Sequence, residues 1–556
     1  MAERTTTAIP GVHVSERDAF PPALVGVATA LPAFIGYTET AVLAGKPVLF
    51  QPVRIGSLAD YERIFGKGFI LLFDIVAGTE EVHDVAAQRW DAAKSRFVTE
   101  FHALERTARA GVFHLYDSVR LFYANGGGDC FVVSVGDYTD GGVSPRGVAI
   151  DGKKLAQGLD AIAVQAGPSL LVVPDAVLLA PTGTHGGMPV SADYDTVTRK
   201  MLAQCGQLQD RFAIIDVYAA DRLHQAASMP DRLDAVVANV HTSVGDQWLS
   251  YGAVYFPDLV TSLHQPAEIR YTSLDLASNL AALQAILTDQ AAYQHPDASA
   301  ADLSPVRNQN PQFLVIKRLI AQIATTTDAS SADGAAAVAQ LDAQLGETLP
   351  LLRQMKNVIA ARANLLPPSG AMAGVYALSD YTRGVWNAPA NVTLNEVVQP
   401  SLAINNQQQG DLNVPIDGKA IDVIRYFVGR GPVVWGTRTL DGNSNDWRYV
   451  QVRRTIVYIE QSIKNALGPF VFEPNEPPTW IAVVAMISNF LQTLWSQGGL
   501  MGAKADEAFT VSCGLGSTMT PANIVDGEMI VQVTLQMIRP AEFIALTFRQ
   551  KMRGPN

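Results

Sequence analysis

The segment Ser512-Cys513-Gly514-Leu515-Gly516 places a hydroxyl and a thiol beside glycines, which are the residue types of a nucleophile site. An α/β hydrolase carries its serine in a G-x-S-x-G turn, and the chain has no such motif. We interpret the segment as a turn of small residues. Gly126–Gly128 follow a predicted helix and precede a predicted strand, whereas a phosphate-binding loop has its glycines between a strand and the next helix. The sequence therefore predicts neither nucleophilic catalysis nor nucleotide binding.

Asp441, Asn443 and Asn445 have the alternate spacing of a calcium-binding loop. The sixth position of such a loop should be glycine and the twelfth glutamate, but the chain has Asp446 and Val452 there, so a polar turn is favoured. The nine histidines include no HExxH motif and no His/Cys cluster with zinc spacing. We expect no catalytic, cofactor-binding or metal-binding residues, and we expect that the chain is not an enzyme.

Bulk properties limit the class of protein. A chain of 556 residues is too long for one core, so two to four domains are expected. The net charge of -12 argues against nucleic-acid binding, which depends on clustered basic residues. No signal peptide is legible, and the most apolar helix candidate, Trp480–Trp495, is too short to span a bilayer. We expect a soluble protein, made and folded in the cytoplasm, with no direct membrane insertion.

The middle of the chain alternates short apolar runs with helix-like segments. The runs are Phe131–Val135, Leu170–Val173 and Phe212–Val217, and the helical segments are Lys153–Val164 and Tyr194–Leu208. Runs without alternation are typical of strands that are buried on both faces. The order predicts a βαβαβ-type middle domain with a partly parallel sheet, within an α/β and α+β multidomain protein.

Two segments resemble insertions into this middle domain, at about residues 76–112 and 265–360. In Val85–Leu104 the large apolar residues recur at spacings of three, four and seven, which predicts an amphipathic helix. Between Tyr271 and Leu365 three more helices are predicted. They are expected at Leu276–Leu287, Phe313–Ile323 and Leu341–Ile359. Tracts of Ala, Ser, Thr and Asp between them predict surface loops.

The C-terminal third is predicted to mix helices and strands. A helical stripe over Ile456–Leu467 is ended by Gly468 and Pro469. Val531–Met537 alternates strictly between apolar and polar residues, which indicates a half-buried strand.

Both ends of the chain predict strands that need a partner. Glu542–Phe548 is apolar on both faces, and an apolar strand at a free terminus invites edge-to-edge pairing. Ile9–Ser15 also alternates, and the polar, proline-containing stretch Arg17–Pro22 follows it. The alternative is that both ends close a sheet within their own subunit, which predicts a stable monomer.

Several ordered blocks give the chain a distinctive signature. The blocks are PGVHVSE (Pro10–Glu16), SGAMAGVYALSDYTRGVWNAPAN (Ser369–Asn391), GRGPVVWGTRTL (Gly429–Leu440), WRYVQVRRTIVYIEQSI (Trp447–Ile463), VFEPNEPPTW (Val471–Trp480), LWSQGGLMG (Leu494–Gly502) and PAEFI (Pro540–Ile544). In this order they resemble the tail sheath protein of contractile phage tails and related contractile injection systems. The likeness is dense over residues 365–550, moderate over 1–70 and 115–260, and absent elsewhere.

The resemblance implies a contractile sheath subunit that polymerises as stacked hexameric rings around an inner tube. It implies that the sheath contracts once, without spending nucleotide, and drives the tube through a target envelope. The implied partners are other copies of the chain, the inner tube protein, and baseplate and terminal cap proteins. Both termini are then arms that exchange strands with neighbouring subunits. The arm residues are Ile9, Gly11, Val12, Val14, Phe543, Ile544, Leu546 and Phe548.

The same resemblance divides the chain into functional parts. Residues 1–22 are the N-terminal arm, and 23–70 with 115–365 form the middle domain, whose insertions are expected on the outer surface. Residues 366–540 form a sheath core domain that faces the tube, and 541–556 are the C-terminal arm. The assembly is expected to be a phage tail or a related particle that is released from the cell. The alternatives are a non-contractile structural tail component and an α/β enzyme with a cryptic site.

Overall fold

The computed structural model of the protein describes residues 24–69, 71–107, 111–139, 147–220, 229–297, 303–327 and 331–543. The chain forms two compact units. The larger unit is Ala28–Val457, and the smaller unit combines Met1–Val27 with Tyr458–Asn556. Each is described by itself.

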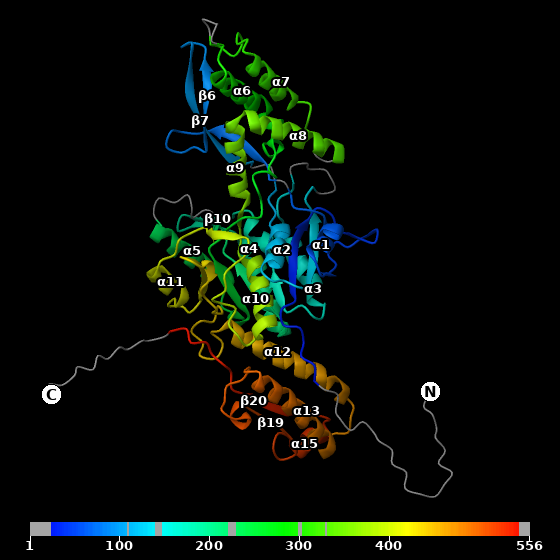
Figure 1. Cartoon of the computed structure of the whole chain (residues 1–556). Helices are drawn as coiled ribbons and strands as arrows, with labels where there is room; N and C mark the ends of the chain where they lie inside the picture. Colours follow the sequence, from blue (N-terminus) through cyan, green and yellow to red (C-terminus); the bar gives the residue numbers. More distant parts are fainter. Residues whose placement is uncertain are drawn as a thin grey trace, which may run out of the picture. The chain divides into compact units, whose positions relative to one another are not determined.

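A sheet forms the centre of the larger unit (Figure 1). It has eight strands, in the order β18-β17-β13-β12-β9-β1-β8-β4. The six inner strands run parallel to one another, and β18 and β4 pair antiparallel at the two edges. In chain order the strands are β1 (Pro32–Thr38), β4 (Val53–Ile55), β8 (Cys130–Asp137), β9 (Leu170–Val172), β12 (Phe212–Asp216), β13 (Gly252–Phe256), β17 (Ile421–Phe427) and β18 (Gly431–Val434).

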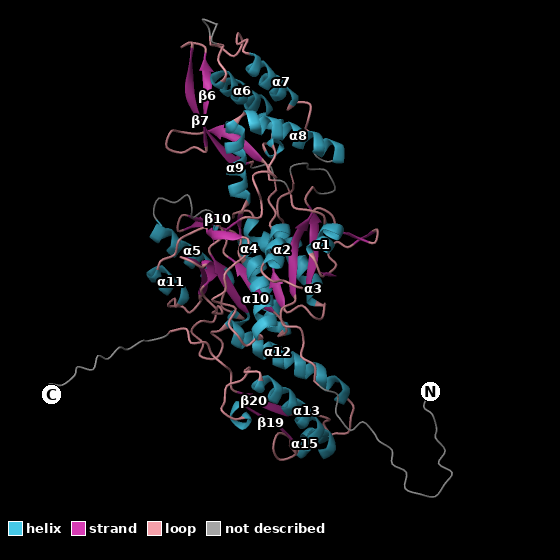
Figure 2. Cartoon of the chain, viewed as in Figure 1, coloured by secondary structure: helices cyan, strands magenta, loops and turns pink. Residues whose placement is uncertain are grey.

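Helices cover both faces of this sheet, because its inner strands are apolar on both faces. In β1 every residue is buried, and Phe34 and Ile35 point into different cores. One face packs on α3, α4 and α5, and the other packs on α1, α2 and α10, which makes three layers (Figure 2). These helices are α1 (Leu58–Phe65), α2 (Leu115–Ala124), α3 (Gly152–Ala163), α4 (Ala192–Leu208), α5 (Met229–Val244) and α10 (Ser369–Arg383).

The predicted βαβαβ order is confirmed by β8, α3, β9, α4 and β12. The sheet also takes in β17 and β18, and α10 covers it, so segments well beyond residue 365 belong to this body. A three-stranded sheet of β14 (Leu259–Thr261), β15 (Leu365–Leu366) and β16 (Val397–Pro400) and the short helix α11 (Asn406–Asn413) complete it. The predicted bounds of the functional parts stay a prediction.

Two buried carboxylates cap the helices α2 and α10. Asp175, just after β9, accepts hydrogen bonds from the backbone amides of His114 and Leu115 at 2.6 and 3.1 Å. Asp216, the last residue of β12, accepts one from the amide of Ser369 at 2.7 Å. Burial raises the pKa of Asp175 to about 6 and that of Asp216 to about 7. Strand ends and helix starts that are far apart in sequence are tied together in this way.

The helices α2 and α10 pack closely because α10 has glycine where they meet. A Cβ atom at Gly370 would lie 2.4 Å from the carbonyl oxygen of Ser118, and one at Gly374 would lie 2.5 Å from that of Phe122. No side chain fits at either position without displacing backbone. The spacing of four residues puts both glycines on one face of α10.

The two predicted insertions form one separate core within the larger unit. The three strands β5 (Phe73–Ala77), β6 (Val85–Asp91) and β7 (Arg96–Arg106) pair in the order β5-β7-β6. Apolar side chains of this sheet, such as Val85 and Leu104, share one cluster with Leu283 and Leu287 of α6. The helices are α6 (Leu276–Gln294), α7 (Pro311–Gln322), α8 (Ala332–Thr348) and α9 (Pro350–Ala363). We call this body the inserted domain.

The helix predicted over Val85–Leu104 was wrong, because this segment is the β6–β7 hairpin. Asp91 shapes the turn, since its carboxylate accepts hydrogen bonds from the amides of Ala93 and Lys94. Val85 and Ala87 are buried while Ala86 is exposed, so the period is two. Spacings of three, four and seven among large residues in both strands imitated a helix.

The third helix predicted in the second insertion was also wrong in extent, because two helices replace it. α8 ends at Thr348 and α9 begins at Pro350, with Leu349 between them. Proline has no amide hydrogen and is favoured at the first position of a helix, so it starts a new one here. Part of the predicted surface loop, from Ala332 onward, is helical in α8.

The smaller unit contains a two-stranded antiparallel sheet against one long helix. Its strands are β19 (Phe509–Cys513) and β20 (Val531–Leu535), and the helix is α13 (Pro477–Ser496). The short helices α14 (Ala505–Ala508) and α15 (Pro521–Val525) precede the two strands. α12 (Val450–Leu467) begins in the larger unit and ends in the smaller one, where the predicted stop at Gly468 is confirmed. The predicted alternating strand is confirmed as β20.

We expect Asp216→Asn to flatten the pH dependence of stability. Because folding raises the pKa of Asp216 above its unfolded value, this group stabilises the fold most below pH 4, and the contribution falls as the pH rises towards 7. The parent should lose up to about 1.4 kcal/mol per pH unit there. Asparagine stays neutral and keeps the oxygen that accepts from Ser369.

Urea unfolding of the unassembled chain between pH 5 and 8 measures this slope. Asp160→Asn is the control, because Asp160 is an exposed partner of Lys200. An unchanged slope in Asp216→Asn would contradict the prediction.

Candidate functional site

Most of the predicted arm residues lie outside the described part of the chain. Ile9, Gly11, Val12, Val14, Ile544, Leu546 and Phe548 are in this group. Phe543 is described, and 75% of its surface is exposed. Strand exchange by the two termini therefore stays a prediction.

The β19–β20 sheet is the element with incomplete pairing in the described part of the smaller unit. It has two strands, and no third strand pairs with it there. Its inner face packs on α13, yet none of its residues is fully buried. A two-stranded sheet is marginally stable in water, and each outer edge presents amide and carbonyl groups for another strand. The sheet can accept added strands on both sides.

One end of this sheet carries exposed apolar and acidic side chains. At this end Cys513 pairs with Val531, and the loop 471–476 approaches through a hydrogen bond of 3.0 Å from the Asn475 amide group to the backbone oxygen of Glu528. The exposed apolar residues are Val471, Phe472, Leu515, Val525 and Ile530, and the acidic ones are Glu473, Glu476, Asp526 and Glu528. We call this set of nine residues the end surface. Sequence reasoning missed it, because exposure of an apolar residue has no sequence signal.

Burial disfavours the reactive thiolate form of two cysteines. Burial raises the pKa of the Cys513 thiol, and it raises the pKa of Cys130 to about 12, so both thiols stay protonated at neutral pH. Gly126–Gly128 lie between α2 and β8, as predicted for a turn. Within the described ranges, no three His, Cys, Asp or Glu side chains are grouped as metal ligands would be.

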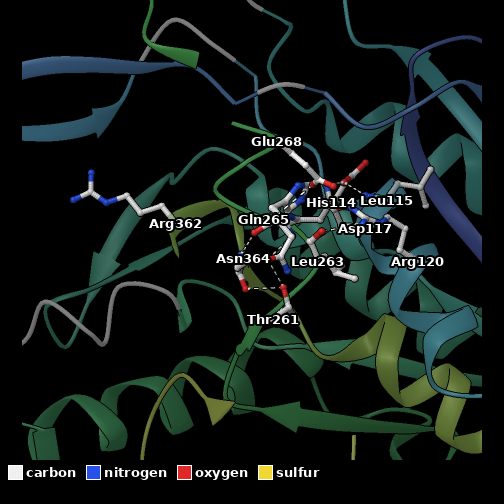
Figure 3. Close-up of polar contacts among 12 residues, drawn as sticks. His114, Leu115, Asp117, Arg120, Thr261, Leu263, Gln265, Glu268, Arg362 and Asn364 are labelled. Carbon is white, nitrogen blue, oxygen red and sulfur yellow. Dashed lines mark hydrogen bonds and ion pairs between the residues drawn. The ribbon is translucent and has the colours of Figure 1, made fainter. Parts of the chain in front are cut away.

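A polar network lies where the inserted domain joins the three-layer body (Figure 3). Asp117 of α2 contacts the imidazole Nε2 of His264 at 2.9 Å and the guanidinium of Arg120 at 3.3 Å. The other end of the same guanidinium donates to the backbone oxygen of Leu263 at 2.9 Å. These contacts fix the segment that follows β14 against α2.

Asn364 joins the two chain segments that lead into and out of α6–α9. Its side-chain oxygen accepts from the backbone amide of His264 at 2.8 Å, and its side-chain nitrogen donates to the His264 backbone oxygen at 2.7 Å (Figure 3). The Thr261 amide donates to the Asn364 backbone oxygen at 2.8 Å. The two ends of the first insertion are also joined, because the amide of Thr107 donates a hydrogen bond to the backbone oxygen of Leu72 at 3.0 Å.

The two insertions also contact each other through side chains. Arg362 of α9 contacts the carboxylate of Asp84 at 2.8 Å, and Arg106 of β7 donates to the backbone oxygen of Arg362 at 3.1 Å. Each insertion therefore leaves and re-enters the three-layer body through two chain segments that lie next to each other.

We expect the inserted domain to be removable as a whole but not in part. Short Gly/Ser linkers in place of residues 73–106 and 267–362 should leave the body folded, because each linker spans ends that are already hydrogen-bonded neighbours. Removal of one segment alone should expose the shared core and cause aggregation. Size-exclusion chromatography and thermal unfolding compare the double deletion with each single deletion. A soluble single deletion with the parent's melting temperature would contradict this.

None of the described helices is both long and apolar enough to cross a membrane.

Comparison with known proteins gives related sheath proteins. A family described as the phage tail sheath C-terminal domain matches residues 443–551. The tail sheath protein of Vibrio phage KVP40 is 24% identical over 190 residues, which are 34% of this chain. The match covers 27% of that relative's length, so the chain aligns with about a quarter of it.

Similarity to solved structures covers nearly the whole chain. A chain of the helical sheath of the anti-feeding prophage (AFP) in the contracted state is 27% identical, with a TM-score of 0.55 and coverage of 98% of this chain and 100% of that one. A chain of the PVC sheath complex of an extracellular contractile injection system, also contracted, is 25% identical, with a TM-score of 0.52 and 99% coverage of each chain. A chain of the AFP baseplate structure is 27% identical, with a TM-score of 0.54 and the same coverage as the AFP sheath. Residues 443–551 thus match the phage tail sheath family, and over nearly its whole length the chain is similar to the sheath proteins of these contractile injection systems.

Proposed function

We propose that the chain is a contractile sheath subunit that polymerises as stacked hexameric rings around an inner tube. The sheath contracts once and drives the tube through a target envelope. The observation that carries this proposal is the similarity, over 99% of both chains, to a sheath complex in its contracted state. The match of the C-terminal residues to a sheath domain and the similarity of the whole fold to a sheath protein support the same function.

The open sheet of the smaller unit supports polymerisation through the chain termini. Arms from neighbouring copies would add strands to the outer edges of β19 and β20. At about 1 kcal/mol net for each hydrogen bond, a four-bond arm contributes roughly 4 kcal/mol before ordering costs. Main-chain pairing does not depend on side chains, so it can persist while subunits rotate relative to one another.

Contraction requires the subunits to adopt two different arrangements while each subunit keeps its own fold. The three-layer body suits this, because a close-packed core resists continuous deformation and passes movement to its contacts. The work is stored when the sheath assembles in an extended state of higher free energy, so no nucleotide is needed.

The proposed partners are other copies of the chain, an inner tube protein, and baseplate and terminal cap proteins. The similar chains are found in a sheath, an extracellular injection system and a baseplate structure, which supports other copies of the chain and the baseplate as partners. The assembly would be a phage tail or a phage tail-like particle that is released from the cell.

We expect the arms to be required for assembly. Replacing Ile544 and Leu546 by Asp, or deleting residues 1–15, should give folded but unassembled protein, because a charged or absent arm cannot pair with the open sheet. Electron microscopy of the purified protein, with inner tube protein added, measures the fraction in striated tubules.

The matched control is V414D/I416D, which places the same two charges on exposed apolar residues of the larger unit. Normal tubules from I544D/L546D would contradict strand exchange by the C-terminal arm. Tubules of the parent that never shorten after a contraction trigger would favour a non-contractile tail component instead.

A further inference from the structure

The end surface of the β19–β20 sheet is held in a fixed shape. The Asn475 side chain donates to the backbone of Glu528 and accepts from the indole nitrogen of Trp480 at 2.7 Å, which ties loop 471–476 to α13 and to the start of β20. Phe472 is fully exposed at 102% and has a φ of +74°. A bulky residue in the left-handed region is strained, and strain of this kind persists where the surrounding structure requires it. The loop therefore exposes the Phe472 ring to solvent at a cost in backbone strain.

All charged residues of the end surface are acidic. Glu473, Glu476, Asp526 and Glu528 are exposed, and none has an ion pair with a described basic residue. Glu528 is held by a hydrogen bond of 2.8 Å from the side chain of Asn523. The opposite end of the sheet is different, because Asp506 and Glu507 there lie close in sequence to Lys504. Over residues 458–543 there are eight acidic and three basic residues, a net charge of -5.

The last thirteen residues of the chain have the complementary composition. From Ile544 onward they contain Arg549, Lys551 and Arg553 and no acidic residue. Phe548 and Met552 add large apolar side chains among these charges. An apolar and acidic surface fits such an apolar and basic segment.

We propose that the end surface binds the basic end of the C-terminal arm, Arg549–Arg553, of a neighbouring copy of this chain. The proposal rests on the proposed function, since it assumes that the arm pairs with the sheet. Ile544–Phe548 has as many residues as β20. An arm in which these residues pair along β20 would therefore extend past the end of β20 from residue 549 onward. Its basic end reaches the end surface when the arm runs antiparallel to β20, because β20 begins beside Glu528. At 3.3 Å per residue, Arg549–Arg553 then covers roughly 16 Å beyond the sheet.

The end surface determines which of the two terminal arms pairs with the sheet and in which direction that arm runs. Main-chain hydrogen bonds alone would accept either terminus in either direction. The N-terminal arm, residues 1–22, has three acidic and two basic residues, so the end surface repels it weakly where it attracts the C-terminal arm. A reversed C-terminal arm would leave its three cations without these partners.

A charge-swap experiment tests the proposal on the full chain. R549E/K551E/R553E and E473K/D526K/E528K should each raise the critical concentration for tubule assembly roughly tenfold, the effect of losing three exposed ion pairs. The chain that carries all six changes should recover the parent's value, because the charges are paired again in reverse. The losses should also shrink at 0.5 M salt, where screening weakens exposed pairs.

The matched control is D506K/E507K, which reverses charge at the opposite end of the same sheet and should assemble as the parent does. Equal loss in this control, or no recovery in the six-fold variant, would overturn the proposal. So would loss of tube binding by E473K/D526K/E528K with normal sheath assembly, since that would assign the end surface to the inner tube. If these variants assemble normally while I544D/L546D does not, the proposed function stands and this inference fails.

A peptide of residues 543–556 gives a second readout that does not need tubules. Its fluorescence anisotropy should rise with added full-length chain, and E473K/D526K/E528K should weaken binding roughly tenfold while D506K/E507K does not. Equal binding to all three chains would overturn the proposal.

Discussion

Unpaired main-chain groups at sheet edges are the constraint on which this structure depends. The large sheet protects its edges. At β18 the segment 391–394 continues the pairing, with hydrogen bonds of 2.8 Å from the Asn391 amide to the Val434 oxygen and 3.0 Å from the Val434 amide to the Val392 oxygen. The other edge strand, β4, has three residues and carries the exposed Arg54. Short or covered edges prevent chance association. The β19–β20 sheet has neither protection among the described residues, and this contrast distinguishes the smaller unit from the large sheet.

The sequence blocks that carry the resemblance to sheath proteins have physical roles in this body. Ser369 carries the amide that Asp216 caps, and Gly370 allows α10 to approach α2. Asp380 from the same block forms an ion pair of 2.6 Å with Arg454, and both side chains are about 95% buried. A buried ion pair costs desolvation unless its geometry is good, and removal of one partner is strongly destabilising. These residues hold the fold, which agrees with a family of structural proteins and with the expectation that the chain is not an enzyme.

Strands that are buried on both faces could be predicted from sequence because apolarity is continuous in them. β8 and β12 were found in this way, and α12 and β20 were found from their own periods. The β6–β7 hairpin was not, because Phe97 and Phe101 in one strand repeat at the helical spacing of four, and the decisive feature was a turn at Asp91. The contact between Asp216 and Ser369 joins residues 153 positions apart, and a single sequence has no signal for it. Similarly, Phe472 could be read as apolar but not as exposed.

Main-chain pairing gives a polymer strength without giving it specificity, because every strand offers the same donors and acceptors. A sheath that presents two free termini to each open sheet must therefore choose between them by side chains. Apolar residues alone cannot make this choice, since both terminal segments contain them. Charge can, because the last thirteen residues are basic and the N-terminal segment is not. Exposed ion pairs are individually weak, and this weakness is useful: a few of them bias the direction of pairing while the hydrogen-bonded strand supplies the strength. A strained, fully exposed Phe472, in the loop that also carries Glu473 and Glu476, suits such a selection surface.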